Sequence, residues 1–239
     1  MSRQHTSADA RMPARTAREV VEAKEQAMLA ASRAIVELFI ERGTNAFTIR
    51  ELASHAGVSE RSFYRYFPRK EDVVRPFLAA GAERIAAELA GRPPDEPLPT
   101  SLVRVWAGSW AATHVEQLRK LYRILRESEG FRAQWFQIMA DSERLWAGAI
   151  AARLGIDPRS HQAALAGAVV SAAARLSTVE YGEAGDGEAG DGEAGGGEAG
   201  GGEAGGGEAG GGEAPAELFA AALAMLGPTL FTAPDPRPR

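Results

Sequence analysis

Apolar residues recur every three or four positions along most of the chain, which is the spacing of helices with one buried face. The first run predicts a helix that begins at the capping pattern Thr16–Glu19 and ends at Gly43. A second capping pattern, Thr48–Glu51, begins a short helix, and Pro68 ends a further helix over 60–67. No stretch keeps the two-residue alternation of a strand, so we predict an all-α fold.

Longer helices are expected beyond this point. One begins near Lys70, ends before Gly91 and contains Pro76, which lacks an amide donor and should bend the helix. We therefore expect Pro76 to act as a hinge between the two ends of the molecule. The other helices are predicted over residues 100–125, with a break near His114, and over 131–154, 158–181 and 216–226.

Three segments lack the helical pattern. Residues 1–15 are polar, which predicts a flexible arm, and the Pro-rich residues 227–239 predict a tail. Residues 182–214 repeat the five-residue units Gly-Glu-Ala-Gly-Asp and Gly-Glu-Ala-Gly-Gly. Because the frequent glycines disfavour regular structure and the acids repel one another, we predict a disordered linker. The net charge is −5, but ten acidic and no basic residues lie in 182–217, so the rest of the chain carries +5. That remainder is compatible with a nucleic-acid partner.

Residues 48–67 have the form of a helix-turn-helix. Gly57 permits a positive φ in the turn, and Ser59 can cap the second helix. Phe63 and Phe67 are four residues apart, so both can face the core. A second helix whose outward residues are polar and basic suits the major groove of DNA. The outward residues here are Glu60, Arg61, Ser62, Arg65 and Tyr66.

This region resembles the tetracycline-repressor (TetR) family of bacterial regulators. The stretches that carry the resemblance are Phe47-Thr48-Ile49-Arg50-Glu51-Leu52-Ala53, Ala56-Gly57-Val58-Ser59 and Phe63-Tyr64-Arg65-Tyr66-Phe67-Pro68-Arg69-Lys70-Glu71-Asp72. The resemblance covers roughly residues 25–85. It implies a three-helix DNA-binding head followed by a helical body that binds a ligand and dimerises.

The resemblance also implies which side chains touch DNA. Thr48, the Tyr64 hydroxyl and Lys70 match positions that contact phosphate, and such groups position the duplex without reading it. Arg61 matches a base-reading position, which suits the bidentate pairing of a guanidinium with guanine. The predicted DNA-binding residues are Thr48, Arg50, Ser59, Glu60, Arg61, Ser62, Tyr64, Arg65, Tyr66 and Lys70.

Two of these assignments have alternatives. Arg50 matches a position that can reach a base edge, yet it can also be an ordinary solvated charge. Glu60 can accept a hydrogen bond from cytosine, or it can simply favour the positive end of the helix dipole. The operator sequence is therefore not predictable from these residues.

Four tryptophans stand out in the body. Trp106 and Trp110 lie four residues apart on one predicted helix, and Trp135 and Trp146 lie on another. Packing between helices accounts for such aromatics. The resemblance implies a ligand cavity in the same region, so we take all four as candidate ligand-binding residues. Four arginines could neutralise an acidic ligand or lie in solvent: Arg104, Arg119, Arg123 and Arg126.

The body is also where the resemblance implies a dimer interface. The matching helices are those around 158–181 and 215–226. The first has a face of small and apolar residues suited to close helix contact, namely Ala164, Leu165, Ala168, Val169, Ala172 and Ala173. The expected organisation is an arm over 1–15, a DNA-binding head over 16–78, a ligand-binding and dimerisation body over 79–226 interrupted by 182–214, and a tail over 227–239.

Other chemistries find little support. The chain has no cysteine, its histidines lack metal-ligand spacing, and neither a nucleophile–base–acid set nor a phosphate-binding glycine loop is visible, so we expect no enzyme, metal or cofactor. Neither a signal peptide nor a membrane span is expected, which favours the bacterial cytoplasm and association with the nucleoid.

The sequence therefore predicts a dimeric, ligand-responsive repressor that binds a palindromic operator in double-stranded DNA and is released by a small-molecule effector of unknown identity. Three alternatives remain: an activator, a ligand-independent architectural DNA binder, and a helical adaptor or enzyme that has kept a vestigial head.

Overall fold

The computed structural model describes residues 17–111, 115–184 and 213–232, and within these ranges every regular element is helical, which confirms the all-α class. The head elements are α1 (Ala17–Arg42), α2 (Ile49–His55), α3 (Glu60–Tyr66) and the 3-10 turn η1 (Lys70–Val74). The body elements are α4 (Arg75–Ala90), α5 (Leu98–Ala111), α6 (Val115–Arg126), α7 (Glu129–Leu154), α8 (His161–Ala184), α9 (Glu213–Ala224) and the 3-10 turn η2 (Pro228–Phe231).

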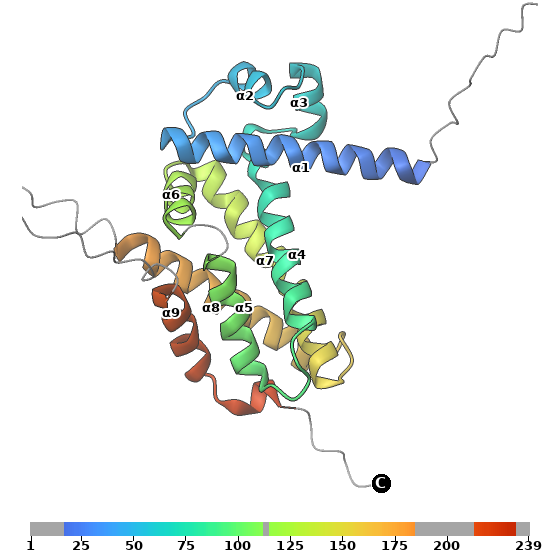
Figure 1. Ribbon diagram of the computed structural model, residues 1–239, viewed down its shortest axis with the longest axis vertical. Coiled ribbons are helices and arrows are strands. Elements are labelled where there is room, and N and C mark those ends of the chain that lie inside the picture. Colours follow the sequence, from blue (N-terminus) through green and yellow to red (C-terminus); the bar gives the residue numbers. More distant parts are fainter. Residues whose placement is uncertain (1–16, 112–114, 185–212, 233–239) are drawn as a thin grey trace, which may run out of the picture.

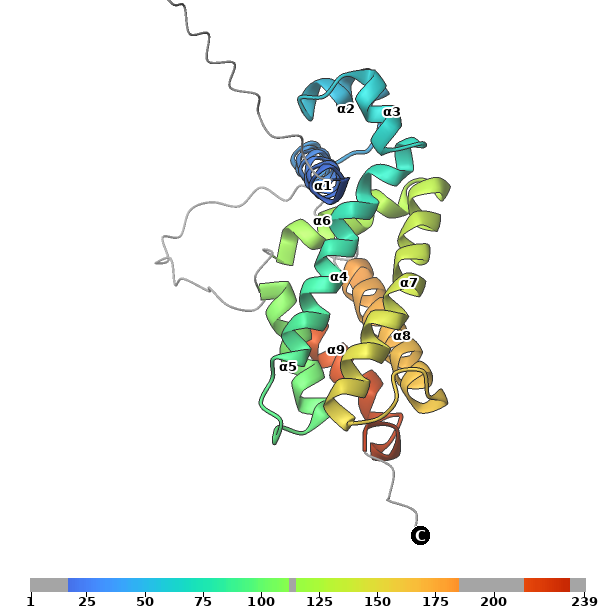
Figure 2. The same ribbon diagram turned by 90° about the vertical axis from the view of Figure 1, so that its right-hand side faces the viewer.

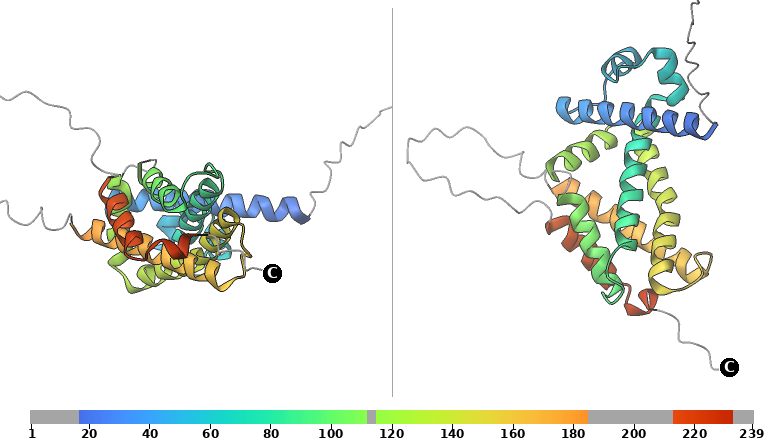
Figure 3. Two further views of the ribbon diagram at one scale, coloured as in Figure 1. Left: turned by 90° about the horizontal axis from the view of Figure 1, so that it is seen from below. Right: turned by 45° about the vertical axis from the view of Figure 1, so that its right-hand side comes forward.

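The arrangement separates a head from a body. Helix α1 lies across the molecule, with α2 and α3 on one side of it and the body helices on the other (Figure 1). Helices α4 and α7 run side by side away from the head, and the packing of α4 against α7 is extensive (Figures 2 and 3). Helices α8 and α9 pack on each other and complete the end of the body that is remote from α2 and α3.

Local signals set most of the helix ends. The Thr48 hydroxyl accepts a hydrogen bond from the Glu51 amide and caps α2. The Glu51 carboxylate in turn accepts one from the Thr48 amide, which confirms the predicted capping box. Gly43 and Gly57 adopt φ values of 66°, so each takes the left-handed conformation that glycine tolerates best.

The predicted non-helical segments are only partly described. The arm, residues 185–212 of the repeat and residues 233–239 of the tail lie outside the described residues, as do Thr16 and His114. The described ends of the repeat differ from the prediction, because α8 extends to Ala184 and α9 begins at Glu213.

The prediction for Pro76 was wrong. Residues Lys70–Val74 form a separate 3-10 turn, and α4 begins only at Arg75. Pro76 therefore lies in the first turn of α4, where a missing amide costs no helical hydrogen bond and the fixed φ favours helix initiation. Because Pro76 lies in the first turn of α4 and not in its interior, it gives no bend of the expected kind and no basis for a hinge.

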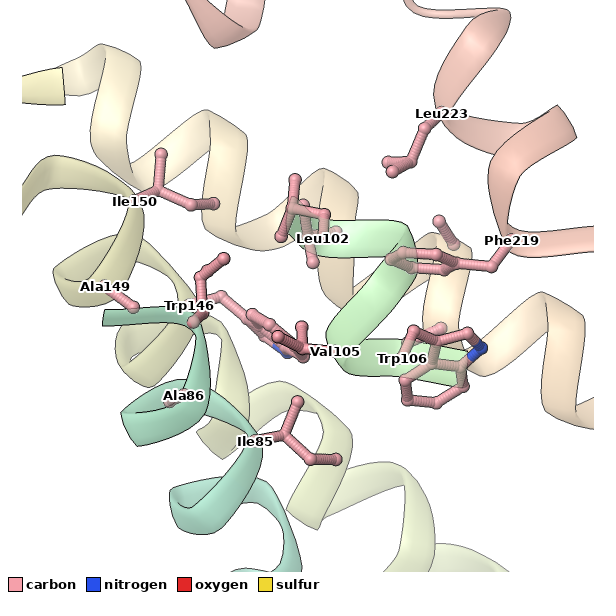
Figure 4. Packing of buried hydrophobic residues seen from close by; sticks show 14 of the residues in the cluster. Ile85, Ala86, Leu102, Val105, Trp106, Trp146, Ala149, Ile150, Phe219 and Leu223 are labelled. Atoms are coloured by element: carbon pink, nitrogen blue, oxygen red, sulfur yellow. The ribbon is translucent and has the colours of Figure 1, made fainter. Parts of the chain in front are cut away.

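Two large apolar clusters form the core. The head cluster includes Ile35, Phe39, Leu52 and Phe63, each with no exposed surface, and it continues into α6 and α7. The body cluster joins α4, α5, α7, α8 and α9 (Figure 4). The head is therefore seated on the body by buried side chains as well as by the covalent link into α4. The division near residue 78 stays a prediction.

Helix α8 is the most apolar of the long helices. By its length and composition alone, the stretch His161–Gly182 could cross a membrane. It packs instead against α7 and α9, with Ala163, Ala166 and Val170 fully buried. A central helix of a folded protein has the same length and composition.

An ionic cluster closes the loop between α4 and α5. The Glu96 carboxylate, whose side chain is only 9% exposed, accepts hydrogen bonds from Arg92 at 2.6 and 2.7 Å and from the Ser101 hydroxyl at 2.6 Å. Arg104 also contacts it. The Arg153 guanidinium on α7 donates to the carbonyls of Arg92 and Glu96 at 2.6 and 2.7 Å. The loop is thus tied to α7 through main-chain acceptors.

This cluster predicts a loss of stability in acid. The hydrogen bonds from Arg92, and next from Ser101, lower the pKa of Glu96 from 4.5 to about 2. Because the folded-state pKa is the lower one, the contribution to stability is complete above pH 4.5 and is lost as the pH falls towards 2. We expect Glu96→Gln to flatten this part of the pH dependence of the free energy of unfolding, measured by urea denaturation. Asp95→Asn, a change at the exposed neighbour, is the control, and an equal flattening by Asp95→Asn would contradict the assignment.

Candidate nucleic-acid interface and body cavity

Helix α3 is anchored by its apolar face and leaves its polar face free. Phe63 and Phe67 are 0% and 1% exposed, and their rings pack edge to face with centroids 5.2 Å apart. Tyr64 is 53% exposed. Glu60, Arg61 and Arg65 are exposed too. Helix α3 lies on the side of α1 opposite the body helices (Figure 1), and the face predicted to meet DNA is its exposed face.

Short-range hydrogen bonds shape the start of α3. The Ser59 hydroxyl accepts from the Ser62 amide at 3.1 Å, which confirms Ser59 as the helix cap. The guanidinium of Arg65 lies 3.4 Å from the Ser62 hydroxyl and 5.3 Å from the centre of the Tyr66 ring. These contacts hold the Arg65 side chain along the helix. Arg61 makes no hydrogen bond or ion pair with the described residues, so its guanidinium is available for a base edge.

The N-terminus of α2 carries a second group of predicted contacts. The Glu51 carboxylate accepts from the Thr48 amide and hydroxyl, both at 2.7 Å. The bond from the Thr48 amide, followed by that from its hydroxyl, lowers the pKa of Glu51. The Thr48 hydroxyl thus already donates its proton to Glu51. A phosphate at this position would have to compete with the Glu51 carboxylate for that hydrogen bond. Lys70 begins η1 and is half-buried, and this burial lowers its pKa.

All ten predicted DNA-binding residues lie on α2, α3, their caps and the first residue of η1. Seven are exposed, whereas Ser62, Tyr66 and Lys70 are half-buried. The structure brings them onto one end of the molecule. Their individual roles on DNA stay predictions.

The body contains a cavity of about 330 Å³ near the head. Its walls come from α1, α4, α5, α6, α7 and α8. All four tryptophans of the chain line it: Trp106, Trp110, Trp135 and Trp146. Figure 4 shows Trp106 and Trp146 within the body cluster, where the Trp106 ring also lies against Phe219, with 5.2 Å between centroids. The two interpretations of these tryptophans are thus compatible, since they pack the core and also wall the cavity.

Hydroxyl groups in this wall are largely engaged within their own helices. Ser109 donates to the Trp106 carbonyl at 2.7 Å, Ser142 to Met139 at 2.7 Å and Thr178 to Ala174 at 2.8 Å. By contrast, the buried Nε1 of Trp106 has no partner among the described residues. Buried donors are rarely left unpaired, and an acceptor on a bound molecule would satisfy this one.

Two charged residues in the wall were missed by the sequence analysis. Arg33 of α1 and Arg84 of α4 line the cavity, whereas the four arginines named above as partners for an acidic ligand do not. No signal in the sequence singles out these two, because each sits on a regular amphipathic helix. Only the approach of α1 to α4 brings their guanidinium groups to one cavity.

The cavity and the head share side chains. Leu121, Tyr122, Leu125 and Trp135 belong both to the cavity wall and to the buried cluster of the head. Polar contacts add to this junction, because the Asn45 side chain donates to the Ile124 carbonyl at 2.7 Å. Gln134 of α7 likewise donates to Asp72 of η1. A molecule that moves α6 or α7 would therefore change the contacts that hold the head against the body.

No group of three or more His, Cys, Asp or Glu side chains that could hold a metal ion occurs within the described residues. The exposed polar face of α3 and the body cavity are the two candidate sites.

A family model matches the head, and two curated proteins are similar over about half of the chain. Residues 33–77 match the family model of bacterial regulatory proteins of the tetR family. The HTH-type transcriptional regulator TcmR of Streptomyces glaucescens is 29% identical over 133 residues, which are 52% of this chain and 59% of TcmR. The uncharacterized HTH-type regulator YerO of Bacillus subtilis (strain 168) is 24% identical over 127 residues, 50% of this chain and 44% of YerO. The chain thus spans less than two thirds of the length of either relative.

Two solved structures are similar over more of the chain. A tetR-family transcriptional regulator from Streptomyces coelicolor has 20% sequence identity and a TM-score of 0.47, with 85% of this chain and 82% of that protein covered. NalD, the secondary repressor of the MexAB-OprM multidrug efflux pump in Pseudomonas aeruginosa, has 17% identity and a TM-score of 0.38, with 68% and 83% covered. The match over residues 33–77, together with the similarity to TcmR, shows that the head of this chain resembles the bacterial regulatory proteins of the tetR family.

Proposed function

We propose that the chain is a sequence-specific DNA-binding repressor of transcription, acting in the cytoplasm on the bacterial chromosome. The observation that carries this proposal is the exposed polar and basic face of α3, held outward by the buried Phe63 and Phe67 within the family-matched region. A helix presented in this way enters the major groove, where Arg61 reads a base and Tyr64 and Thr48 contact phosphate. Binding over a promoter blocks access of the polymerase.

The repressor acts as a homodimer. Helix α8 carries Leu165 and Leu176, which are 46% and 44% exposed, and Met225 just beyond α9 is 86% exposed. Exposed apolar residues on α8 and directly after α9 support a self-complementary contact between two copies. A two-fold dimer places two recognition helices in successive major grooves, so the operator is a palindrome with half-sites about 34–36 Å apart.

An effector in the cavity releases the operator. The support is that Tyr122 and Trp135 line the cavity and also belong to the apolar cluster of the head. A ligand that fits only one position of α6 and α7 therefore changes how the head packs on the body. The ligand shifts the equilibrium only by the difference between its affinities for the two states.

Selection of binding sites from random duplexes at about 0.15 M salt tests the DNA-binding proposal. We expect a palindrome to be recovered. Arg61→Ala should relax selection at one position in each half-site, at a cost of about 1–3 kcal/mol there. Tyr64→Phe should weaken binding to all sequences alike, because it removes a phosphate contact.

The outcomes separate the proposal from its rivals. Tight binding without sequence enrichment would indicate an architectural DNA binder. Absence of binding would indicate an adaptor or enzyme with a vestigial head. Arg18→Gln, which changes an exposed arginine on α1 already paired with Glu22, is the control for a general loss of positive charge.

A further inference from the structure

The charged residues that line the body cavity in the described part of the chain are both arginines. Arg33 and Arg84 line it, and none of the other described residues in its wall is Asp, Glu, Lys or His. Arg84 lies 3.8 Å from Glu88, which partly compensates its charge. Arg33 forms no ion pair with a described residue. A cation in this cavity would meet no carboxylate and would be repelled, whereas an anion would gain a partner.

The remaining wall is aromatic and aliphatic. Two aromatic pairs from different helices line it: Trp106 with Trp110 on α5, with ring centroids 6.0 Å apart, and Tyr122 of α6 with Trp135 of α7, 4.9 Å apart. Such rings offer faces and edges on which a flat aromatic molecule packs well. A volume of about 330 Å³ is near the lower end for small-molecule sites, which limits the ligand to a few rings.

We propose that this cavity binds a small planar aromatic acid, with its rings among the tryptophans and its negative charge at Arg33. This inference rests on the proposed function, for which it names the chemical class of the effector. Because Arg33 belongs to α1, a helix of the head, the acid touches head and body at once. The charge of the ligand thus acts directly on the element that supports α2 and α3.

A matched set of probes with one ring system tests the inference on the full chain. Naphthoate, naphthylmethanol and naphthylmethylamine carry a negative, a neutral and a positive substituent. All four tryptophans line the cavity, so quenching of their fluorescence reports occupancy, and calorimetry gives the affinities. We expect naphthoate to bind roughly tenfold more tightly than naphthylmethylamine, or better.

Variants locate the charge effect. Arg33→Gln should weaken naphthoate binding about tenfold and leave naphthylmethanol within about twofold. Arg18→Gln, on the same helix but remote from the cavity lining, should change neither. Equal or tighter binding of naphthylmethylamine, equal losses for all three probes in Arg33→Gln, or no quenching by any probe would each overturn the inference.

Binding-site selection on the same protein preparations keeps the two proposals apart. If a palindrome is recovered but the probes show no preference for the anion, only the inference about the ligand fails. If naphthoate binds with the expected preference but no DNA sequence is enriched, the cavity assignment stands and the repressor proposal fails.

Discussion

Replacing Phe63 by alanine is expected to lower the free energy of unfolding by about 3–5 kcal/mol. The Phe63 side chain is fully buried, it packs on Phe67, and it belongs to the apolar cluster that holds α2 and α3 against α1. Its removal leaves a cavity that the short helix α3 cannot refill without shifting. We expect a lower midpoint in urea denaturation and loss of DNA binding, because the recognition helix loses its anchor.

The adjacent Tyr64 provides a matched control. It is an aromatic residue of similar size on the same helix, but it is 53% exposed. Tyr64→Ala should leave the free energy of unfolding within about 0.5–1 kcal/mol of the wild type and still weaken DNA binding. If both variants lost stability to the same extent, the assignment of the two faces of α3 would be wrong.

The second large effect is expected at Gly167, where α8 crosses α7. A Cβ at this position would overlap the Glu143 carbonyl oxygen and lie 2.8 Å from the Ala147 amide nitrogen. Both are backbone atoms, so the two helices would have to separate. Gly167→Ala is therefore expected to destabilise the protein by about 1–3 kcal/mol, seen as a lower midpoint of thermal or urea unfolding.

Gly148 gives the opposite expectation for the same substitution. It lies on α7, and a Cβ built there meets nothing within 4 Å. Because alanine favours a helix more than glycine does, Gly148→Ala should raise stability by about 0.5–1 kcal/mol. Changes of the same sign at Gly148 and Gly167 would show that helix propensity, and not the close approach of α7 and α8, governs both positions.

The sequence alone was sufficient for features that depend on neighbouring residues. The capping box at Thr48, the turn at Gly57 and the cap at Ser59 are each built by contacts within a few residues, so the pattern predicts them directly. Helical spacing likewise predicted the buried pair Phe63 and Phe67. These local features together define the recognition face of α3, because the residues opposite the buried pair must face outward.

Only the tertiary structure decided which distant side chains share a site. The sequence pattern placed Pro76 in the interior of a helix. It could not show that Lys70–Val74 forms a separate 3-10 turn, whose Asp72 accepts a hydrogen bond from Gln134 of the distant helix α7. It could not identify Arg33 and Arg84 either, since each is one of many arginines on amphipathic helices. Hydrogen bonds within a turn are set by local spacing. The cavity and its charge arise from the packing of helices that are far apart along the chain, and no local pattern encodes that packing.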